Sequence, residues 1–393
     1  MKHRVQRLRA AFDTAQMPCD IWLLLVALVL AGIGWVMVSS ASVALLDDSY
    51  HYAIRHGVFL LMAILAATLM VSLPLALWRQ NAGIILALSL VLLALVLLVG
   101  QDINGSKRWI ALPGPLPSLQ VSEVGKIGLV FYMAAFMARF AESLRTRMLT
   151  LVRPLMVLAL PAVLLFAAPD FGGMVVYTVC VVGMLMMAGA SIVLLTGTGI
   201  VLGLGAALMV AMEPYRLARW TSFLDPWADQ FATGYQLTQA LIAFGRGHVT
   251  GTGLGNSIQK LHFLPEAHTD FIFAVIAEEL GMLGAVMVVV LFTLLIVRAM
   301  VIGRRAELAG QLFAAYMSYG IGFIIAAQAF INMAVSSGLL PTKGLTLPLI
   351  SYGGSSLLVT GVMVGLLLRA DRETRRYPRR APAPAEQRRR ARR

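Results

Sequence analysis

Long apolar runs dominate the chain and restrict it to one class of fold. A helix needs about 20 apolar residues to cross the hydrocarbon core of a bilayer, and hydropathy marks ten segments of that kind. They cover residues 19–41, 53–73, 81–100, 121–140, 151–168, 171–189, 191–212, 269–298, 311–335 and 345–368. Because these runs are continuous and do not alternate with polar residues, a transmembrane β-barrel is excluded. The sequence therefore predicts an all-α polytopic membrane protein with ten transmembrane helices.

Basic residues set the predicted orientation. With the N-terminus inside, most of the 32 Lys and Arg residues fall in cytoplasmic segments, as the positive-inside rule requires. We therefore expect both termini in the cytoplasm, with a basic segment over 1–18, the membrane domain over 19–368 and an Arg-rich disordered tail over 369–393. On the other side, residues 213–268 are expected to form one large extracytoplasmic loop between the seventh and eighth helices.

The formal net charge of +13 does not indicate a nucleic-acid-binding protein. Most of the excess lies in residues 1–18 and 369–393, where basic side chains are attracted to anionic lipid. Cys19 and Cys180 fall at different depths of their spans, which argues against a disulfide. No spacing of Cys and His is typical of a metal site.

The large loop contains two recognisable segments. QLTQALIAF (236–244) has apolar residues at helical spacing, which predicts a helix lying in the membrane interface. GRGHVTGTGLGNS (245–257) has five glycines but lacks the Gly-Lys-Ser/Thr ending of a phosphate-binding P-loop. We interpret it as a flexible, tightly turning substrate loop.

Polar residues inside the spans are the next candidates, because an ionisable group in a membrane is expensive to keep there. Glu123 and Lys126 are three apart on one helix face and can pair. The pair either binds substrate or only neutralises itself. Gln328 and Asn332 are expected mainly to link helices by hydrogen bonds, and SYGGSS (351–356) is expected to pack helices closely inside the last span.

The stretch LPEAHTDFIFAVIAEELG (264–281) places charge in and beside an apolar run. A structural interpretation is available, in which Thr269 caps the helix and Asp270 lies in its first turn. Glu278 follows two turns later on nearly the same face. A helix cap needs no such partner, whereas a site that handles protons or a cationic group can use one.

Five motifs together carry a resemblance to a known family. They are NGSKRWI (104–110), VSEVGK (121–126), PDFGG (169–173), GTGLGNSIQKLHFLPEAHTDFIFAVIAEELG (251–281) and LPTKGLTLPLISYGGSS (340–356). In this order they resemble the SEDS family of shape, elongation, division and sporulation proteins, and its division type more than its elongation type. The resemblance implies a ten-helix peptidoglycan glycosyltransferase that polymerises lipid II into glycan strands. One residue departs from the family pattern, since Val121 stands where Pro is usual.

The resemblance also implies roles for individual residues. Asp270 is expected to act as the general base on the acceptor hydroxyl, and fixed cations are expected to stabilise the pyrophosphate leaving group. The predicted substrate-binding residues are Lys126, Glu123, Arg108, Lys343, Glu278, His268, Ser351, Lys260 and Arg246. A divalent cation, Mg²⁺ or Mn²⁺, could assist, and no other cofactor is expected.

Expected partners follow from the same resemblance. The substrates are lipid II and a glycan linked to undecaprenyl pyrophosphate, and the protein partners are a class B penicillin-binding protein and other membrane proteins of the division machinery at the septal inner membrane. Gly281 and Gly284 are small residues that would admit the partner's helix against the eighth span. Three alternatives stay open: a lipid II flippase or transporter, an elongation-type polymerase, and a noncatalytic scaffold. A flippase should carry polar residues through the whole membrane thickness.

Overall fold

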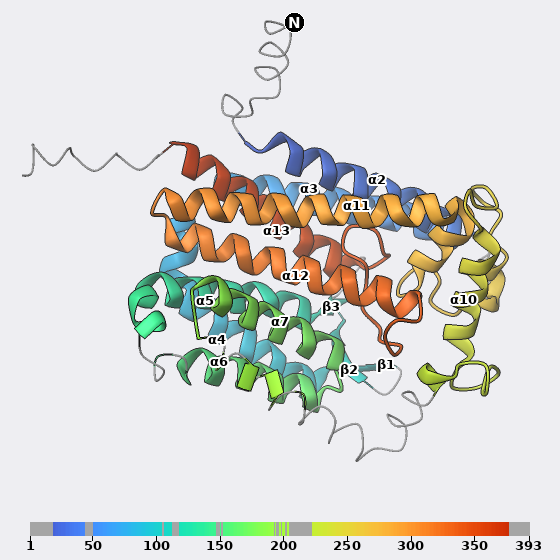
Figure 1. Ribbon diagram of the computed structural model, residues 1–393, viewed down its shortest axis with the longest axis horizontal. Helices are drawn as coiled ribbons and strands as arrows, with labels where there is room; N and C mark the ends of the chain where they lie inside the picture. Colours follow the sequence, from blue (N-terminus) through green and yellow to red (C-terminus); the bar gives the residue numbers. More distant parts are fainter. Residues whose placement is uncertain are drawn as a thin grey trace, which may run out of the picture.

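The computed structural model describes residues 19–43, 50–103, 106–111, 118–146, 152–191 and 222–376, with isolated residues between 150 and 203. Long helices run side by side, and α10 lies across one end of the bundle (Figure 1). The helices are α2 (Ile21–Ala41), α3 (His51–Ser72), α4 (Leu75–Val99), α5 (Val121–Thr146), α6 (Val152–Ala167), α7 (Phe171–Met187), α10 (Tyr235–Gly247), α11 (Ile272–Leu308), α12 (Leu312–Ser336) and α13 (Gly354–Arg376), with a short π-helix, η3, over Gln259–Phe263.

The apolar runs form helices as predicted. Within the described ranges, seven helices are long and apolar enough to cross a membrane, and α6 and α7 are shorter apolar helices. The predicted span over 191–212 lies mostly outside the described residues, as do residues 1–18 and 377–393. The chain is therefore a polytopic helical membrane protein.

Two helix boundaries differ from the prediction for identifiable reasons. Helix α4 begins at Leu75 and not at residue 81, because Pro74 precedes it in an extended conformation that suits a helix start. Helix α13 continues past residue 368, because ion pairs fix its last turns. Arg369 pairs with Glu373 at 2.7 Å, and Glu373 also accepts from the Leu75 amide at 3.0 Å.

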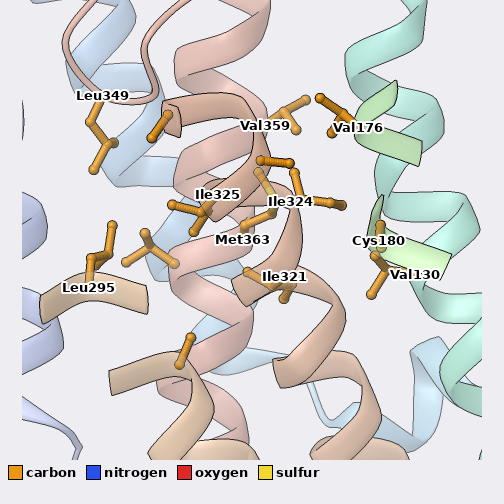
Figure 2. Packing of buried hydrophobic residues seen from close by; sticks show 14 of the residues in the cluster. Val130, Val176, Cys180, Leu295, Ile321, Ile324, Ile325, Leu349, Val359 and Met363 are labelled. Atoms are coloured by element: carbon orange, nitrogen blue, oxygen red, sulfur yellow. The ribbon is translucent and has the colours of Figure 1, made fainter. Parts of the chain in front are cut away.

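Helix α12 lies at the centre and packs against α5, α7, α10, α11 and α13. Glycines permit the close approach on one side, because a Cβ on Gly183 would lie 2.7 Å from the ring of Phe323. Around α12, branched aliphatic side chains such as Ile321, Ile324 and Ile325 fill the space between helices (Figure 2). This packing fixes the central helix that carries Gln328 and Asn332.

Helix α11 is interrupted at Gly281, where the backbone takes φ 68° and ψ −168°. The segment 247–253 lies against the break and completes its hydrogen bonds. The amides of Thr252 and Gly253 donate to the carbonyls of Glu278 and Glu279, and the amides of Met282 and Leu283 donate to the carbonyls of His248 and Val249, all at 3.0–3.1 Å. Irregular backbone at membrane depth is stable only where protein satisfies its polar groups. Residues 247–253 of the predicted substrate loop are therefore bonded to α11, and the positive φ angles of Gly251, Gly253 and Gly255 agree with the predicted tight turns.

The other loops also contain regular structure. Strands β1 (Gln101–Ile103), β2 (Ser106–Ile110) and β3 (Leu119–Gln120) form a small antiparallel sheet. Strand β3 leads directly into α5, so this helix begins at Val121 without the Pro that is usual there. The predicted helix over 236–244 is confirmed as α10, and it packs against α11 and α12.

Candidate functional site

Asp270 lies just before α11, in a turn and not in the helix. The predicted N-cap at Thr269 is wrong: α11 begins at Ile272 after Phe271, which provides no side-chain cap. Thr269 instead turns back, and its hydroxyl donates to Glu266 Oε2 at 2.6 Å. The turn forms because the Phe271 amide donates to the Glu266 carbonyl at 3.1 Å. The Asp270 side chain therefore does not cap α11.

Three elements hold the backbone around Asp270. Asn332 on α12 donates its Nδ2 to the Asp270 carbonyl at 2.8 Å and to the Leu345 carbonyl at 2.5 Å. The Ser351 hydroxyl donates to the Thr269 carbonyl at 2.6 Å. These bonds attach the turn to α12 and to the segment before α13, so the position of Asp270 is determined by residues distant in sequence.

The Asp270 carboxylate has an unusual environment. Within the described part of the chain it makes no hydrogen bond or ion pair, and it lies so close to Gly344 that a Cβ there would be 2.8 Å from Asp270 Oδ2. Desolvation by the surrounding protein raises the pKa of the Asp270 carboxyl to about 7, and the nearby Glu266 carboxylate raises it further, while Arg108 opposes the shift. Because some exposure remains, the carboxyl can meet a substrate and exchange a proton near neutral pH.

Two of the predicted cations lie around the start of α7, on the same side as Asp270. Arg108 on β2 donates to the carbonyls of Ala168 and Pro169, and its Nη1 is 3.8 Å from Asp170 Oδ1. Lys343 is next to Gly344 in sequence, and its Nζ is 5.1 Å from the centre of the Phe171 ring. Arg108 thus places positive charge close enough to lower the pKa of the Asp270 carboxyl.

Glu123 and Lys126 form a buried network with three further elements. Lys126 Nζ donates to Glu123 Oε1 at 2.6 Å and to Gln328 Oε1 at 2.9 Å. Gln328 Nε2 donates to the Thr346 carbonyl at 3.2 Å, and the Thr346 hydroxyl donates to Ser356 Oγ at 2.9 Å. Through the bond to Thr346, the network therefore holds in place the segment that carries Gly344 next to Asp270. Glu123 Oε2 has no partner among the described residues.

Glu278 belongs to a second cluster, with Arg246 and Lys260. Arg246 Nη1 is 3.1 Å from Glu278 Oε1, and Lys260 Nζ is 2.8 Å from Glu279 Oε1. Both carboxylates are fully buried. Glu278 also accepts from the amide of Ile258 at 3.0 Å, and Glu279 accepts from the hydroxyl of Ser40 on α2 at 2.7 Å. We call Arg246, Ser257, Lys260, Glu278 and Glu279 the loop clamp, because it fastens the large loop to α11 and α2.

The SYGGSS motif is not inside a helix as predicted. Residues 345–353 are irregular, and α13 begins only at Gly354. Hydroxyl groups explain the difference: Ser351 accepts from the Leu347 amide at 2.7 Å, and Ser355 accepts from the Gln120 amide at 3.0 Å. The Ser351 bond holds residues 347–351 in a turn outside α13, and the Ser355 bond ties the first turn of α13 to strand β3.

His268 lies two residues before Asp270 and faces α3. Its ring contacts Tyr52 at 4.9 Å and Tyr352 at 5.6 Å between centroids, and its backbone carbonyl accepts from the Tyr352 amide at 3.0 Å. Sequence reasoning did not identify Tyr52, Tyr352 or Gly344 as site residues. No single-sequence signal distinguishes a tyrosine or a glycine of this kind from one that only packs.

A divalent cation bound by protein needs several ligand side chains close together. Across the described ranges, no group of three His, Cys, Asp or Glu residues is arranged to hold a metal ion. The structure therefore adds no support for a divalent cation, which stays an expectation from the chemistry.

A family model described as "Cell cycle protein", which covers FtsW, RodA and SpoVE, matches residues 21–376. The chain belongs to the SEDS family. It is 57% identical over 384 residues to "Probable peptidoglycan glycosyltransferase FtsW" of Halomonas elongata, covering 96% of both chains. It is 47% identical over 372 residues to the FtsW of Hahella chejuensis, covering 93% of both.

Solved structures of SEDS proteins have the same fold. One is a chain of a peptidoglycan synthase complex described as coordinating polymerization and crosslinking, with a TM-score of 0.76 at 29% identity, covering 91% of this chain and 99% of that chain. Another is the rod shape determining protein RodA of Thermus thermophilus, with a TM-score of 0.67 at 28% identity, covering 91% and 98%. Within the SEDS family the chain most resembles the FtsW type.

Proposed function

We propose that this protein is a peptidoglycan glycosyltransferase of the FtsW type, which polymerises lipid II into glycan strands during septal wall synthesis. The observation that carries the proposal is the unpaired Asp270 carboxylate, with a pKa of about 7, held beside Gly344 at one end of the bundle. FtsW relatives named as peptidoglycan glycosyltransferases support the same reaction.

Asp270 acts as the general base. It accepts the proton of the acceptor's sugar hydroxyl while the hydroxyl oxygen forms a bond to the anomeric carbon of the donor glycan. The bond from that carbon to the pyrophosphate oxygen breaks, and undecaprenyl pyrophosphate leaves with the electron pair. Arg108 and Lys343 stabilise the negative charge that develops on the leaving group.

The charge of Lys126 is already engaged inside the protein. Its side chain is 1% exposed, and its ammonium already donates to Glu123 and Gln328. We therefore assign Glu123 and Lys126 to positioning, since their network supports Thr346 and the segment beside Asp270. The loop clamp also has a positioning role, because it fixes the other end of helix segment 272–280.

The distribution of charge favours an enzyme over a flippase. In the described helices, charged side chains occur near the Asp270 end, as in Glu123, Lys126 and Glu278, or near the opposite end, as in Arg79 and Arg298. Between them, buried hydroxyls such as those of Ser318 and Thr360 bond to the backbone of their own helices. A path for a polar headgroup across the whole membrane would need more polar side chains at mid-depth.

The remaining architecture follows from the orientation argument. We expect both termini in the cytoplasm, and residues 213–268 and Asp270 on the other side of the septal inner membrane, with the predicted seventh span over 191–212 completing the set of ten. The concentration of basic residues at the termini supports this orientation.

A class B penicillin-binding protein is the partner, among other division proteins. The similarity to a chain of a peptidoglycan synthase complex supports it. Gly281 and Gly284 do not provide the docking surface, because both are buried at the helix break. The exposed apolar face of α11, which includes Met282, Leu283 and Val286, is the surface on which a partner helix can lie.

Purified wild-type protein and the Asp270→Asn variant, each with its partner and labelled lipid II, test the function. Glycan strands from the wild type and none from the variant are expected. Strands from both would remove Asp270 as the base, and strands from neither would remove the proposed activity.

A further inference from the structure

Three rings from separate parts of the chain meet next to Asp270. Tyr52 lies in the first turn of α3, His268 precedes α11 and Tyr352 precedes α13. Their centroids are 4.9 Å (Tyr52 to His268), 5.1 Å (Tyr52 to Tyr352) and 5.6 Å (His268 to Tyr352) apart. We call these three residues the ring cluster. All three are partly exposed, so the cluster presents aromatic surface outward and is not sealed in the core.

Buried histidine nitrogens in and behind this cluster lack partners within the described chain. Among the described residues, His268 Nδ1 is buried without a hydrogen-bond partner, while Tyr52 and Tyr352 are partly exposed, so that their hydroxyls remain open to water or a ligand. Behind the cluster, His56 is fully buried against Tyr352, and both of its ring nitrogens are also unpartnered. Buried polar groups are normally hydrogen-bonded, so a group of unpartnered ones calls for a ligand or bound water.

The chemistry of the cluster fits a sugar. A pyranose ring offers an apolar face of C–H groups together with hydroxyls at its edge, and it matches aromatic surface combined with hydrogen-bonding groups. Burial lowers the pKa of His268, so its imidazole is neutral near pH 7 and can both donate and accept a hydrogen bond.

The position of the ring cluster beside Asp270 favours the acceptor sugar as its ligand. The Tyr352 amide donates to the His268 carbonyl at 3.0 Å, and Ser351 bonds the Thr269 carbonyl at 2.6 Å. The ring cluster is therefore fixed to the same turn that carries Asp270. A sugar that rests on the cluster therefore lies next to this turn, where the acceptor hydroxyl must reach the base.

We infer that Tyr52, His268 and Tyr352 form the binding subsite for the acceptor amino sugar, with the two tyrosines providing the stacking surface. This inference rests on the proposed function and adds the subsite that positions the acceptor. Asp270 supplies the proton acceptor, and the ring cluster supplies the affinity that orients the hydroxyl toward it.

The experiment measures polymerisation rates of the purified protein with its partner over a range of lipid II concentrations. Tyr52→Leu and Tyr352→Leu should each raise KM for lipid II about tenfold, because loss of an aromatic contact costs about 1 kcal/mol or more, while kcat changes little. Tyr352→Phe, which keeps the ring and loses only the hydroxyl, should raise KM less than Tyr352→Leu does. Tyr132→Leu is the matched control: Tyr132 is also partly exposed and stacks on a ring, Phe136 on α5, at 6.4 Å.

A binding measurement keeps the test independent of turnover. In an Asp270→Asn background, Tyr352→Leu should weaken binding of labelled lipid II about tenfold, and Tyr132→Leu should not. The inference is overturned if KM and lipid II affinity stay unchanged in both Leu variants, or if these variants lose kcat and thermal stability together at unchanged KM, as a packing role requires. Failure of the wild type to polymerise would remove the proposed function itself and the subsite with it.

Discussion

Gly251 and Gly281 meet backbone to backbone at the break in α11. A Cβ on Gly281 would lie 2.3 Å from the Gly251 amide nitrogen, and both residues have positive φ, 83° and 68°. Only glycine adopts such conformations readily and leaves room for this approach. The contact joins the large loop to the helix segment that follows Asp270.

Gly281→Ala should destabilise the protein strongly. A backbone with φ 68° and ψ −168° is essentially restricted to glycine and costs about 1–3 kcal/mol with a side chain present, and the clash with residues 249–251 adds about 1–3 kcal/mol. Gly310→Ala is the control, because Gly310 has a φ of 78° with nothing near its absent Cβ. Thermal melting in detergent should show a clearly larger loss for Gly281→Ala. Equal losses of melting temperature would mean that the contact between Gly281 and Gly251 does not contribute to stability.

Activity should depend on the ionisation of Asp270. A carboxyl with a pKa of about 7 is mostly protonated at pH 6 and mostly ionised at pH 8, and only the ionised form accepts a proton. The rate at saturating lipid II should therefore fall about tenfold per pH unit below pH 7. A rate profile that stays flat down to pH 5 would contradict a general base with this pKa.

The same residue should cost stability at high pH. Because the pKa of Asp270 is raised from 3.8 to about 7 in the folded protein, its contribution to stability is full below pH 3.8 and is lost as the pH rises through about 7. Asp270→Asn should consequently melt at a higher temperature than the wild type at pH 8, with a smaller difference at pH 5. A variant that melts lower at pH 8 would show that the carboxylate stabilises the fold.

Lys126→Met should destabilise the protein by about 3–5 kcal/mol, because it leaves the buried Glu123 carboxylate without a counter-charge. Adding Glu123→Gln should restore most of that stability, since no buried charge remains, and most of the activity, if the pair only positions Gln328 and Thr346. Melting temperatures and lipid II polymerisation of the two single variants and the double variant measure both effects. A stable but inactive double variant would return Lys126 to direct contact with substrate.

Lys260→Met should loosen the large loop. Glu279 is fully buried and would lose its ammonium partner, at a cost of about 3–5 kcal/mol. Limited chymotrypsin digestion should then cut residues 222–260 faster than in the wild type. Arg304→Ala is the control, since the Arg304–Glu307 pair is largely exposed on Arg304 and exposed pairs contribute little. Unchanged digestion of Lys260→Met would contradict the role of the loop clamp.

Gly344→Ala should reduce kcat while the fold stays intact. The new Cβ would lie 2.8 Å from Asp270 Oδ2, so the carboxylate must move, and small displacements of a catalytic group can cost about 100-fold in rate. In Gly353→Ala, in the same segment, the new Cβ would meet Thr346 Cγ2 at 3.3 Å and Ser356 Cβ at 3.7 Å, so this variant should be milder. Similar kcat values for both variants would show that Asp270 tolerates displacement.

The sequence predicted the helices well, because long apolar runs have few alternatives to crossing a membrane. It failed where polar groups replace helical hydrogen bonds. The predicted span over 345–368 is apolar enough overall for a helix, yet its first part is irregular because Ser351 bonds a turn from another part of the chain. The break at Gly281 was equally hidden, since a glycine within an apolar run is also compatible with close helix packing.

The candidate site was predictable only in part. Asp270, Glu123 and Lys126 were noticeable because charge beside apolar runs is rare. Their division into a base and a positioning network depends on contacts between residues about 200 positions apart, such as Lys126 with Gln328. Periodicity within one helix cannot reveal such contacts.

The break in α11 also sets the height at which the base works. A straight helix would carry residue 270 about 16 Å beyond Gly281, at 1.5 Å per residue. Instead, Asp270 is bonded to Asn332, one turn inside the end of α12. A lipid-linked substrate keeps its pyrophosphate among the headgroups, and the sugars attached to it reach only a short way outward. A base at this depth meets them while both lipid tails remain in the bilayer, and the lengthening strand can move away into water.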